Sequence, residues 1–290
     1  MTIHKHAALI TAYKNFSYLE ALVKKLSPHF SVYIHVDKSS TEIGSEKMTY
    51  LEETYGCRCF AKYVCCWAGF NNLLAYIELL RVAQCNHHEY YHILSGEDLP
   101  VRSYADIEQL FQGNDQIYIS FHKADGAAWE ERYKHYYIFV NKDPHKRLYA
   151  TLNKLSIGIQ KAFGVRRTRL GNETDMYKGY IFGSLPHDVV SYVVRYVDAN
   201  PKFMKDISTT FISEEFFLQT ILGNSEYKDR IAHNCLRYSV WEYKNGSIPG
   251  YLDETDILEL ERGDYIFARK VNYKASEKLI SHMDRLWPET

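Results

Sequence analysis

Ala7-Ala-Leu-Ile-Thr-Ala-Tyr13 opens the part of the sequence that decides the fold, because this short apolar run predicts a buried strand. Residues 16–26 follow with apolar side chains at helical spacing, and Val32-Tyr-Ile-His-Val36 is a second apolar run that ends in Asp37. The order strand, helix, strand predicts a βαβ unit, whose two strands lie parallel in one sheet.

The same alternation continues as far as residue 94. Helical spacing recurs near residues 44–55 and 69–83, and apolar runs recur near 58–64 and 90–94. This succession predicts an α/β fold with a Rossmann-like, mostly parallel central sheet flanked by helices. Ligands bind such sheets beyond the carboxyl ends of the strands, where His35, Asp37 and Ser95-Gly-Glu-Asp-Leu-Pro100 stand in this sequence.

The rest of the chain is more mixed and shows no internal repeat. A polar stretch covers residues 129–137. We expect strands near 116–120, 180–184, 236–241 and 265–269, and helices near 146–163, near 187–197, from 213 and from 275. The predicted organisation is one domain over residues 1–290, with a nucleotide-binding half of about 1–115 and an acceptor-binding and catalytic half of about 116–290.

Composition excludes several classes of function. The formal net charge of −1 provides no field that would attract the chain to nucleic acid. The first residues lack the basic start and apolar run of an export signal, and no apolar stretch of about 18 residues follows, so we expect a cytoplasmic protein. Its six cysteines are then expected to be reduced, and the spacing of those at 57, 59, 65 and 66 favours structural thiols over a zinc site.

Residues 142–170 form a basic segment. It contains eight Lys and Arg residues against a single acid, Asp143. Such a segment could contact the inner face of a membrane or a phosphate-bearing acceptor. A solvated helix face is the other interpretation, and single-sign stretches often have no ligand.

Ile212-Ser-Glu-Glu-Phe-Phe217 predicts the start of a helix, with Ser213 as its N-cap and two carboxylates in its first turn. The two glutamates can simply complement the helix dipole. One of them can instead serve as a general base, because a carboxylate at a helix amino terminus stays ionised at neutral pH. Consecutive helical residues point about 100° apart, so only one of the two is expected to face a cleft comfortably.

The chain lacks the D-x-D motif with which many sugar-nucleotide enzymes hold Mn²⁺ or Mg²⁺. Glu97-Asp98 is the nearest acidic pair, but adjacent strand-end residues diverge and offer too few ligands for a divalent ion. If no metal ion is bound, fixed Lys or Arg side chains would have to neutralise the diphosphate that leaves a sugar nucleotide. Arg269 and Lys270, at the end of one late strand, and Arg237, on the strand before it, are the candidates.

The ordered set of motifs resembles the core-2/I-branching β-1,6-N-acetylglucosaminyltransferases and peptide O-xylosyltransferases, known as glycosyltransferase family 14. The resemblance covers nearly the whole chain. Its motifs are His6-Ala-Ala-Leu-Ile-Thr-Ala-Tyr13, Tyr33-Ile-His-Val-Asp-Lys38, Trp67-Ala-Gly-Phe70, Tyr91-His-Ile-Leu-Ser-Gly-Glu-Asp-Leu-Pro100, Tyr177-Lys-Gly179, Ser213-Glu-Glu-Phe-Phe217, Leu236-Arg-Tyr-Ser-Val-Trp241 and Phe267-Ala-Arg-Lys270.

This resemblance implies a GT-A type fold and an inverting single displacement that needs no divalent ion. It places the general base on Glu215 and a diphosphate-binding lysine at Lys270. It also implies that Asp37 lies beside the uridine of the donor. Acceptor contacts fall on Trp241, on the Glu131-Arg132 pair and on Asp98, which we expect to shape the cleft rather than to bind metal.

Two departures from the family pattern concern the donor. Animal members carry a further arginine upstream of the Phe-Ala-x-Lys element, whereas residues 249–256 here contain no cation. Either Arg237 or Arg269 substitutes for it, or the diphosphate is held more weakly. Tyr180-Ile-Phe-Gly183 stands where many bacterial members have a Trp pair, which leaves the choice of donor sugar open.

The expected function is transfer of N-acetylglucosamine or xylose from a UDP-sugar to a glycan or glycolipid hydroxyl, in bacterial surface polysaccharide assembly on the cytoplasmic side. A non-catalytic carbohydrate- or nucleotide-binding protein on the same fold is the alternative. A dinucleotide oxidoreductase or nucleotidyltransferase is disfavoured, because neither G-x-G-x-x-G nor G-x-x-x-x-G-K-[ST] follows the first strand.

Overall fold

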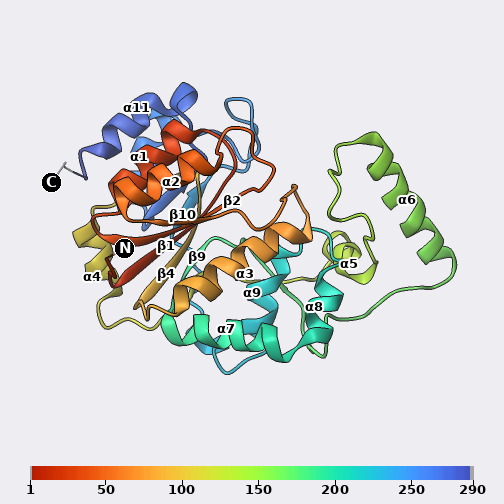
Figure 1. Ribbon diagram of the computed structural model, residues 1–290. Helices are drawn as coiled ribbons and strands as arrows, with labels where there is room; N and C mark the ends of the chain where they lie inside the picture. Colours follow the sequence, from red (N-terminus) through yellow and green to blue (C-terminus); the bar gives the residue numbers. More distant parts are fainter. Residues whose placement is uncertain (1, 288–290) are drawn as a thin grey trace.

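A six-stranded sheet forms the centre of the protein in the computed structural model, which describes residues 2–287 (Figure 1). The strand order is β3-β2-β1-β4-β9-β6. The first four of these strands along the chain are parallel, and β9 is antiparallel to both of its neighbours, β4 and β6. The strands are β1 (His6–Ala12), β2 (Phe30–Val36), β3 (Arg58–Phe60), β4 (Tyr90–Ser95), β6 (Tyr118–Ile119) and β9 (Gly183–Pro186). The predicted α/β architecture with a mostly parallel sheet is confirmed.

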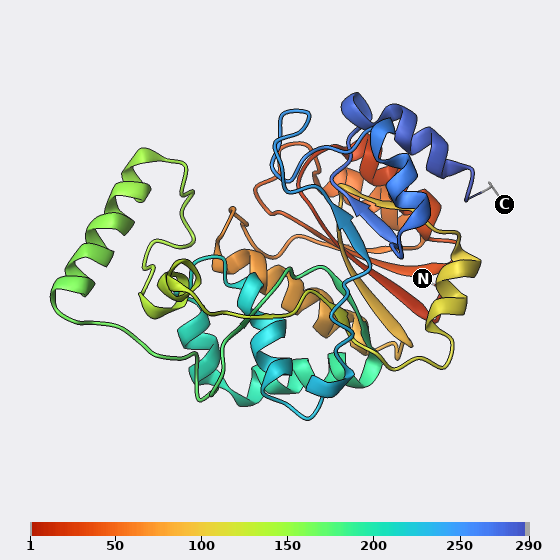
Figure 2. The same ribbon diagram turned by 180° about the vertical axis from the view of Figure 1, so that it is seen from behind.

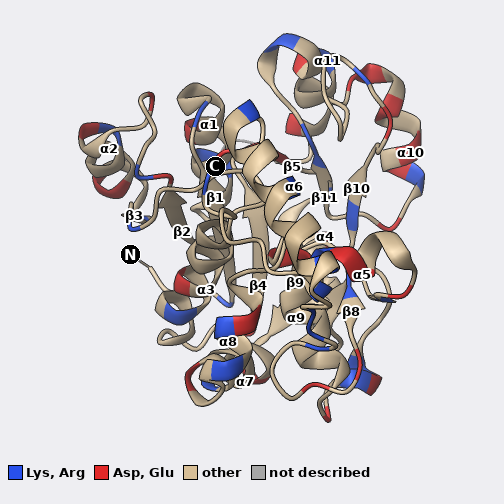
Figure 3. Ribbon diagram, turned by 90° about the vertical axis from the view of Figure 1, so that its right-hand side faces the viewer, with Lys and Arg blue, Asp and Glu red and all other residues tan. Residues whose placement is uncertain are grey.

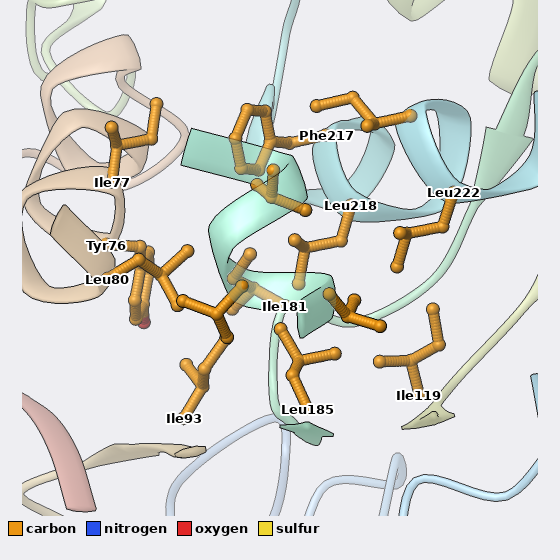
Figure 4. Close-up of a cluster of buried hydrophobic side chains, with 14 of the residues drawn as sticks. Tyr76, Ile77, Leu80, Ile93, Ile119, Ile181, Leu185, Phe217, Leu218 and Leu222 are labelled. Atoms are coloured by element: carbon orange, nitrogen blue, oxygen red, sulfur yellow. The ribbon is translucent and has the colours of Figure 1, made fainter. Parts of the chain in front are cut away.

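Helices cover both faces of this sheet, and alternate strand residues supply the two cores. Leu9 and Tyr33 belong to a core with α3 (Phe70–Gln84), α7 (His187–Ala199) and α9 (Glu214–Gly223), part of which Figure 4 shows. Ala8 and Ile10 face the opposite core, which α1 (Phe16–Leu26), α2 (Ser45–Tyr55) and α4 (Tyr104–Phe111) complete. Burial on both faces explains why these strands are continuous apolar runs rather than alternating ones.

A second sheet joins distant parts of the chain. It has the order β10-β11-β5, formed by Arg237–Ser239, Phe267–Arg269 and Asp98–Pro100. β11 runs antiparallel to β5, and this register sets Arg269 opposite Asp98. Two helices, α10 (Ile257–Arg262) and α11 (Tyr273–Asp284), contribute buried side chains to the core behind this sheet.

The second half of the chain holds the remaining elements. They are a small sheet of β7 (His122–Lys123) and β8 (Tyr177–Lys178), the helices α5 (Ala127–Lys134), α6 (Arg147–Ala162) and α8 (Pro201–Ile207), and the 3-10 turns η1 (Lys228–Arg230) and η2 (Glu254–Asp256). α6 and the segments that flank it on both sides form an arm that projects from the rest of the protein (Figures 1 and 2). Within residues 2–287, no helix combines the length and the apolar character needed to cross a bilayer.

The structure corrects several predicted elements. The strand near 58–64 ends at Phe60, and the strand near 180–184 begins only at Gly183. Asp98–Pro100, predicted as part of a turn, is the strand β5, because its partner β11 lies about 170 residues further along the chain. The polar stretch 129–137 contains most of α5, whose face toward the body buries only Tyr133. Such a short, weakly apolar helix leaves little periodic pattern in a sequence.

Candidate active site

A cavity of about 680 Å³ opens at the carboxyl ends of β1, β2 and β4, where the sequence predicted a ligand site. Side chains from α5, from the start of α9 and from the end of β11 complete its walls. Six of the nine predicted site residues line it: Asp37, Arg132, Glu215, Trp241, Arg269 and Lys270. These residues lie up to about 230 positions apart in the chain, and the sheet topology brings them together.

Asp37 occupies the end of β2 and is held in place by backbone donors. Its Oδ1 accepts hydrogen bonds from the backbone N–H groups of Ser39 (2.9 Å) and Cys65 (3.1 Å). The neighbouring His35 is buried, and its Nε2 accepts from the backbone N–H groups of Lys62 and Tyr63, both at 3.3 Å. Burial lowers the pKa of His35, so this ring is neutral at the cavity wall.

Two cations at the end of β11 enter the cavity. Arg269 donates from Nε to Asp98 Oδ1 (3.0 Å), and its guanidinium group lies 3.6 Å from the centre of the Phe182 ring. Lys270 is half-buried and donates from Nζ to Ser247 Oγ at 3.4 Å. Burial lowers the pKa of the Lys270 amine. A bound anion would reverse this effect, because an opposite charge stabilises the protonated form.

Lys14 is a third cation in the cavity wall, and the sequence analysis did not identify it. It follows β1 directly, and its Nζ lies 3.1 Å from Glu97 Oε1. Tyr251 completes the group, since its hydroxyl donates to the same Glu97 oxygen at 3.0 Å and accepts from Lys14 at 3.3 Å. The turn after the first strand is where many nucleotide enzymes bind phosphate, so the position of Lys14 in the sequence was an available clue.

Glu215 faces Arg132 across the cavity wall. Arg132 Nη1 donates to Glu215 Oε2 at 2.6 Å, and the Glu215 side chain keeps 19% of its surface exposed. Burial raises the pKa of Glu215, and the adjacent guanidinium group opposes that rise. Arg132 itself stacks on Trp129, with its guanidinium carbon 4.1 Å from the ring centre. Glu215 therefore combines access to the cavity with a fixed cationic partner.

Glu214 points to a different neighbour. Asn72, on α3, donates to Glu214 Oε1 at 3.0 Å, whereas Oε2 has no hydrogen-bond partner among residues 2–287. Complete burial raises the pKa of Glu214 to about 7. Both glutamates line the cavity, although only one was expected to face it comfortably, and Glu215 is the more exposed of the two.

Ser213 occupies the predicted N-cap position of α9 but does not form the predicted cap. It has helical backbone angles, φ −57° and ψ −32°, and its side chain makes no capping hydrogen bond. A capping serine normally has an extended backbone, from which its oxygen can reach the N–H groups of the first turn. The amino terminus of α9 is instead connected to Gly179, whose N–H donates to the Glu215 carbonyl at 2.9 Å.

Trp241 and Tyr180 form an aromatic wall. Their rings are stacked, with centroids 4.9 Å apart and planes 11° apart. Trp241 is 47% exposed, and its Nε1 donates to Ser239 Oγ at 3.1 Å. Flat apolar faces with polar edges suit sugar rings. The sequence analysis noted Tyr180 only in relation to the donor sugar and did not predict this pair.

Three predicted site residues lie outside the cavity lining. Asp98 is 1% exposed beneath Arg269, and its carboxylate also accepts from the backbone N–H of Ser95. Arg237 pairs with Phe267 of β11, which is two residues farther from the cavity than Arg269. Its guanidinium group donates to the Gly183 carbonyl at 2.8 Å. Glu131 pairs with Lys161 of α6 at 3.0 Å. Each of them supports a neighbouring segment rather than the cavity surface.

The cysteine cluster is divided by the structure. Cys57 and Cys59 lie together at the edge of the sheet, with sulfur atoms 3.7 Å apart, and Cys65 and Cys66 line the cavity. Burial raises the pKa of the Cys65 thiol to about 12, so it is protonated at neutral pH. Nowhere in residues 2–287 do three or more His, Cys, Asp or Glu side chains gather in a way that could hold a metal ion.

Comparison with known proteins defines the family. Residues 7–260 match the sequence profile of the family described as Core-2/I-Branching enzyme. The chain belongs to this family. The match includes the strands that build the sheet, the start of α9 and the aromatic wall. Membership in this family is consistent with a GT-A-like fold.

A more distant likeness concerns one animal protein. The chain is 24% identical over 277 residues to "Xylosyltransferase 1" of Mus musculus. This alignment covers 88% of the present chain but only 27% of the mouse protein. The chain therefore corresponds to about a quarter of the length of that relative.

Proposed function

We propose that this branching-enzyme family member transfers N-acetylglucosamine or xylose from a UDP-sugar to a hydroxyl group of a glycan or glycolipid, with inversion and without a divalent metal ion. One observation carries the proposal. A partly exposed carboxylate, Glu215, lines the same cavity as its partner Arg132 and three further cations, Lys14, Arg269 and Lys270. A base and an anion-binding wall are the two requirements of glycosyl transfer from a nucleoside diphosphate.

The proposed reaction is a single displacement. Glu215 takes the proton from the acceptor hydroxyl while that oxygen forms a bond to C1 of the donor sugar. The bond between C1 and the diphosphate oxygen breaks at the same time, and its electron pair leaves with UDP. Lys270 and Arg269 stabilise the negative charge that develops on the diphosphate, and Lys14 adds a third cation near it.

The contacts of the two acids nearest the cations support catalysis without metal. Glu97 is engaged by Lys14 and Tyr251, and Asp98 is engaged by Arg269. A divalent ion would have to displace these cations before it could use either carboxylate. These pairs support the proposal that protein cations take the part of a divalent ion.

The remaining residues receive proposed supporting roles. Asp37, fixed by two backbone N–H groups, is suited to accept hydrogen bonds from the uridine. Trp241 and Tyr180 are suited to stack on the acceptor sugar, and Arg132 holds the base in position. Asp98, Arg237 and Glu131 act as positioning residues, since all three lie outside the cavity lining.

As part of the same proposal, the enzyme works on the cytoplasmic side of the membrane in bacterial surface polysaccharide assembly. The second candidate is a carbohydrate- or nucleotide-binding protein without catalysis. Retention of both Glu215 and Lys270 in one cavity favours the enzyme, because a pure binding site would not need the base.

The test measures release of UDP from a panel of UDP-sugars in the presence of glycan acceptors. Glu215→Gln should lower kcat by about 10²–10⁴-fold, the usual contribution of a general base, while UDP binding in calorimetry stays nearly unchanged. Glu46→Gln is the matched control, because Glu46 is also a first-turn glutamate but lies on α2. Full turnover by Glu215→Gln would remove the residue from its role.

Two further results of the same assay bear on the proposal. Activity should persist in excess EDTA. Loss of turnover on chelation, followed by recovery with Mn²⁺, would overturn metal independence. If the parent protein binds UDP but releases none from any sugar nucleotide, the non-catalytic candidate replaces the enzyme.

A further inference from the structure

The helix α6 exposes an unusual amount of apolar surface. Leu148, Leu155, Ile159 and Phe163 are 62%, 60%, 61% and 79% exposed. Their separations of seven, four and four residues place them in one row along the helix and the residue that follows it. We call these four residues the apolar row. A row of large apolar side chains on an isolated helix usually marks an interaction surface.

A neighbouring face of α6 is already occupied, so the apolar row is a separate surface. Gln160 is buried and bonds the backbone N–H and carbonyl of Tyr136, both at 2.8 Å. Tyr149 packs near Phe139, with ring centroids 6.5 Å apart. The helix is thus held by the segment that precedes it, and the apolar row turns to solvent.

A row of cations runs along another exposed side of α6, about 100° or more around the helix from the apolar row. Arg147, Lys154 and Lys161 follow one another at spacings of seven residues, and α6 contains no Asp or Glu (Figure 3). Six of the eight cations of residues 142–170 form no ion pair with any residue of the described chain: Lys142, Lys146, Arg147, Lys154, Arg166 and Arg169. Lys161 pairs with Glu131, and Arg167 is buried. The surface is therefore both apolar and strongly basic.

Arg167 attaches the arm to the body. Its guanidinium group donates to the carbonyl of His135 at 3.1 Å and to the hydroxyls of Thr209 (2.8 Å) and Thr210 (3.0 Å). The other end of the arm lies at the cavity, since His145 contacts Trp67, a cavity-lining residue, with ring centroids 5.3 Å apart. α6 is consequently placed at a fixed position beside the cavity mouth.

We propose that α6 binds the surface of an anionic lipid membrane, with the apolar row inserted among the acyl chains and the cations at the level of the headgroups. An interfacial helix combines these two rows in this way, since apolar burial and attraction to anionic headgroups add. Pairing with a second copy of this chain fits less well. A symmetric pair of α6 helices would bring two basic rows close together, with no acid on α6 to neutralise them.

The experiment is co-sedimentation of the full chain with vesicles of phosphatidylcholine alone or mixed with phosphatidylglycerol. The parent should bind the anionic vesicles, more weakly at high salt, and should bind the neutral vesicles at least about tenfold more weakly. Replacing Leu155, Ile159 and Phe163 by Ser should weaken binding to the anionic vesicles by about tenfold or more. Arg147→Gln with Lys154→Gln should give a similar loss together with a smaller dependence on salt.

Leu258→Ser is the matched control, because Leu258 is 56% exposed on α10, away from the arm, and should not matter for binding. Circular dichroism and sedimentation velocity of each variant report its folding and its oligomeric state. Failure of the parent to bind anionic vesicles would overturn the inference, as would full binding by the Ser variant. A dimer of the parent that the Ser variant loses, without vesicle binding, would assign the row to self-association. Because no sugar nucleotide is present, a negative result would leave the proposed reaction untouched.

Discussion

The carboxylate of Glu215 is subject to two opposing influences. Burial in the cavity wall raises its pKa, whereas the guanidinium group of Arg132, 2.6 Å away, lowers it. A general base must be ionised to accept a proton, so Arg132 extends the working range of Glu215 toward lower pH. The resemblance to the family predicted both residues but not this contact, which depends on how α5 meets the start of α9.

This contact gives a prediction for pH dependence. In Arg132→Gln the pKa of Glu215 should rise further, because the opposing charge is gone, and the acid limb of kcat/KM should move up by about one pH unit. The measurement is a pH profile of turnover with one UDP-sugar and one acceptor. Arg132→Lys keeps a positive charge and should leave the limb close to its original position. An unshifted limb with a uniformly lower rate in Arg132→Gln would mean that Arg132 does not tune the base.

At the scale of elements, the start of α9 depends on a close contact that only glycine allows. A Cβ on Gly179 would lie 1.9 Å from the Ser120 carbonyl oxygen, and the Gly179 N–H is bonded to the Glu215 carbonyl. Because the clash is with backbone, one of the two segments would have to move. This explains the glycine of the Tyr177-Lys-Gly179 motif in physical terms.

Gly179→Ala should therefore lower the free energy of unfolding by about 1–3 kcal/mol and also reduce kcat. Urea denaturation and the UDP-release assay measure the two effects. Gly158→Ala is the matched control on α6, where nothing lies within 4 Å of the added Cβ, and it should be neutral or slightly stabilising. Equal stability of the two alanine variants would show that the contact at Gly179 is not restrictive.

The elements also show how far the sequence can predict this structure. The helix expected over residues 16–26 matches α1, and the strands before and after it are correct to within two residues, because local periodicity determines them. β5 escapes such an analysis, and β9 was predicted to begin three residues too early. Each is short, and the antiparallel pairing that defines it joins segments about 90 to 170 residues apart.

The site residues also divide into those that local motifs predict and those that depend on contacts between distant segments. Asp37, Glu215 and Lys270 were predicted from motifs and do line the cavity. The stacking of Tyr180 on Trp241 was missed because it depends on a contact between distant segments. Lys14 was missed although its position just after the first strand was a local clue. Arg237 was predicted to belong to the site because of its charge. It lies at the start of its strand, two residues before the end that faces the cavity, and therefore stays outside the lining.

At the scale of the whole molecule, two buried histidines of the central sheet, His6 and His92, lie away from the cavity. His6 on β1 lies with Nδ1 3.0 Å from Nε2 of His92 on β4, and both rings are buried. Burial lowers the pKa of His6 to about 4 and that of His92 well below its ordinary value. The charges nearest His6 are Glu108, which opposes the effect, and Lys5 and His88, which add to it. The folded protein therefore keeps His6 neutral where the unfolded chain would protonate it.

The consequence is a loss of stability in mild acid. His6 contributes little pH dependence above about pH 7.5, where both states are neutral, and a progressive loss from there down to about pH 4. At about 1.4 kcal/mol for each pH unit between these pKa values, the loss is about 2 kcal/mol at pH 5. Glu214 acts in the opposite direction, since its pKa of about 7 makes the folded state gain stability as the pH falls.

Because these effects oppose one another, the pH dependence of the parent alone cannot isolate His6, and a difference between two proteins is needed. His6→Phe removes the titrating group from a site already lined by Phe30 and Phe111. Relative to the parent, the variant should gain about 2 kcal/mol between pH 7 and pH 5, whatever its stability at pH 7. Urea denaturation at the two pH values measures this difference. His29→Phe serves as the control, because His29 is only partly buried whereas His6 is buried, and its replacement should change the difference less. If the free energies of unfolding of the parent and His6→Phe differ by the same amount at pH 7 and at pH 5, the sheet tolerates a charged His6.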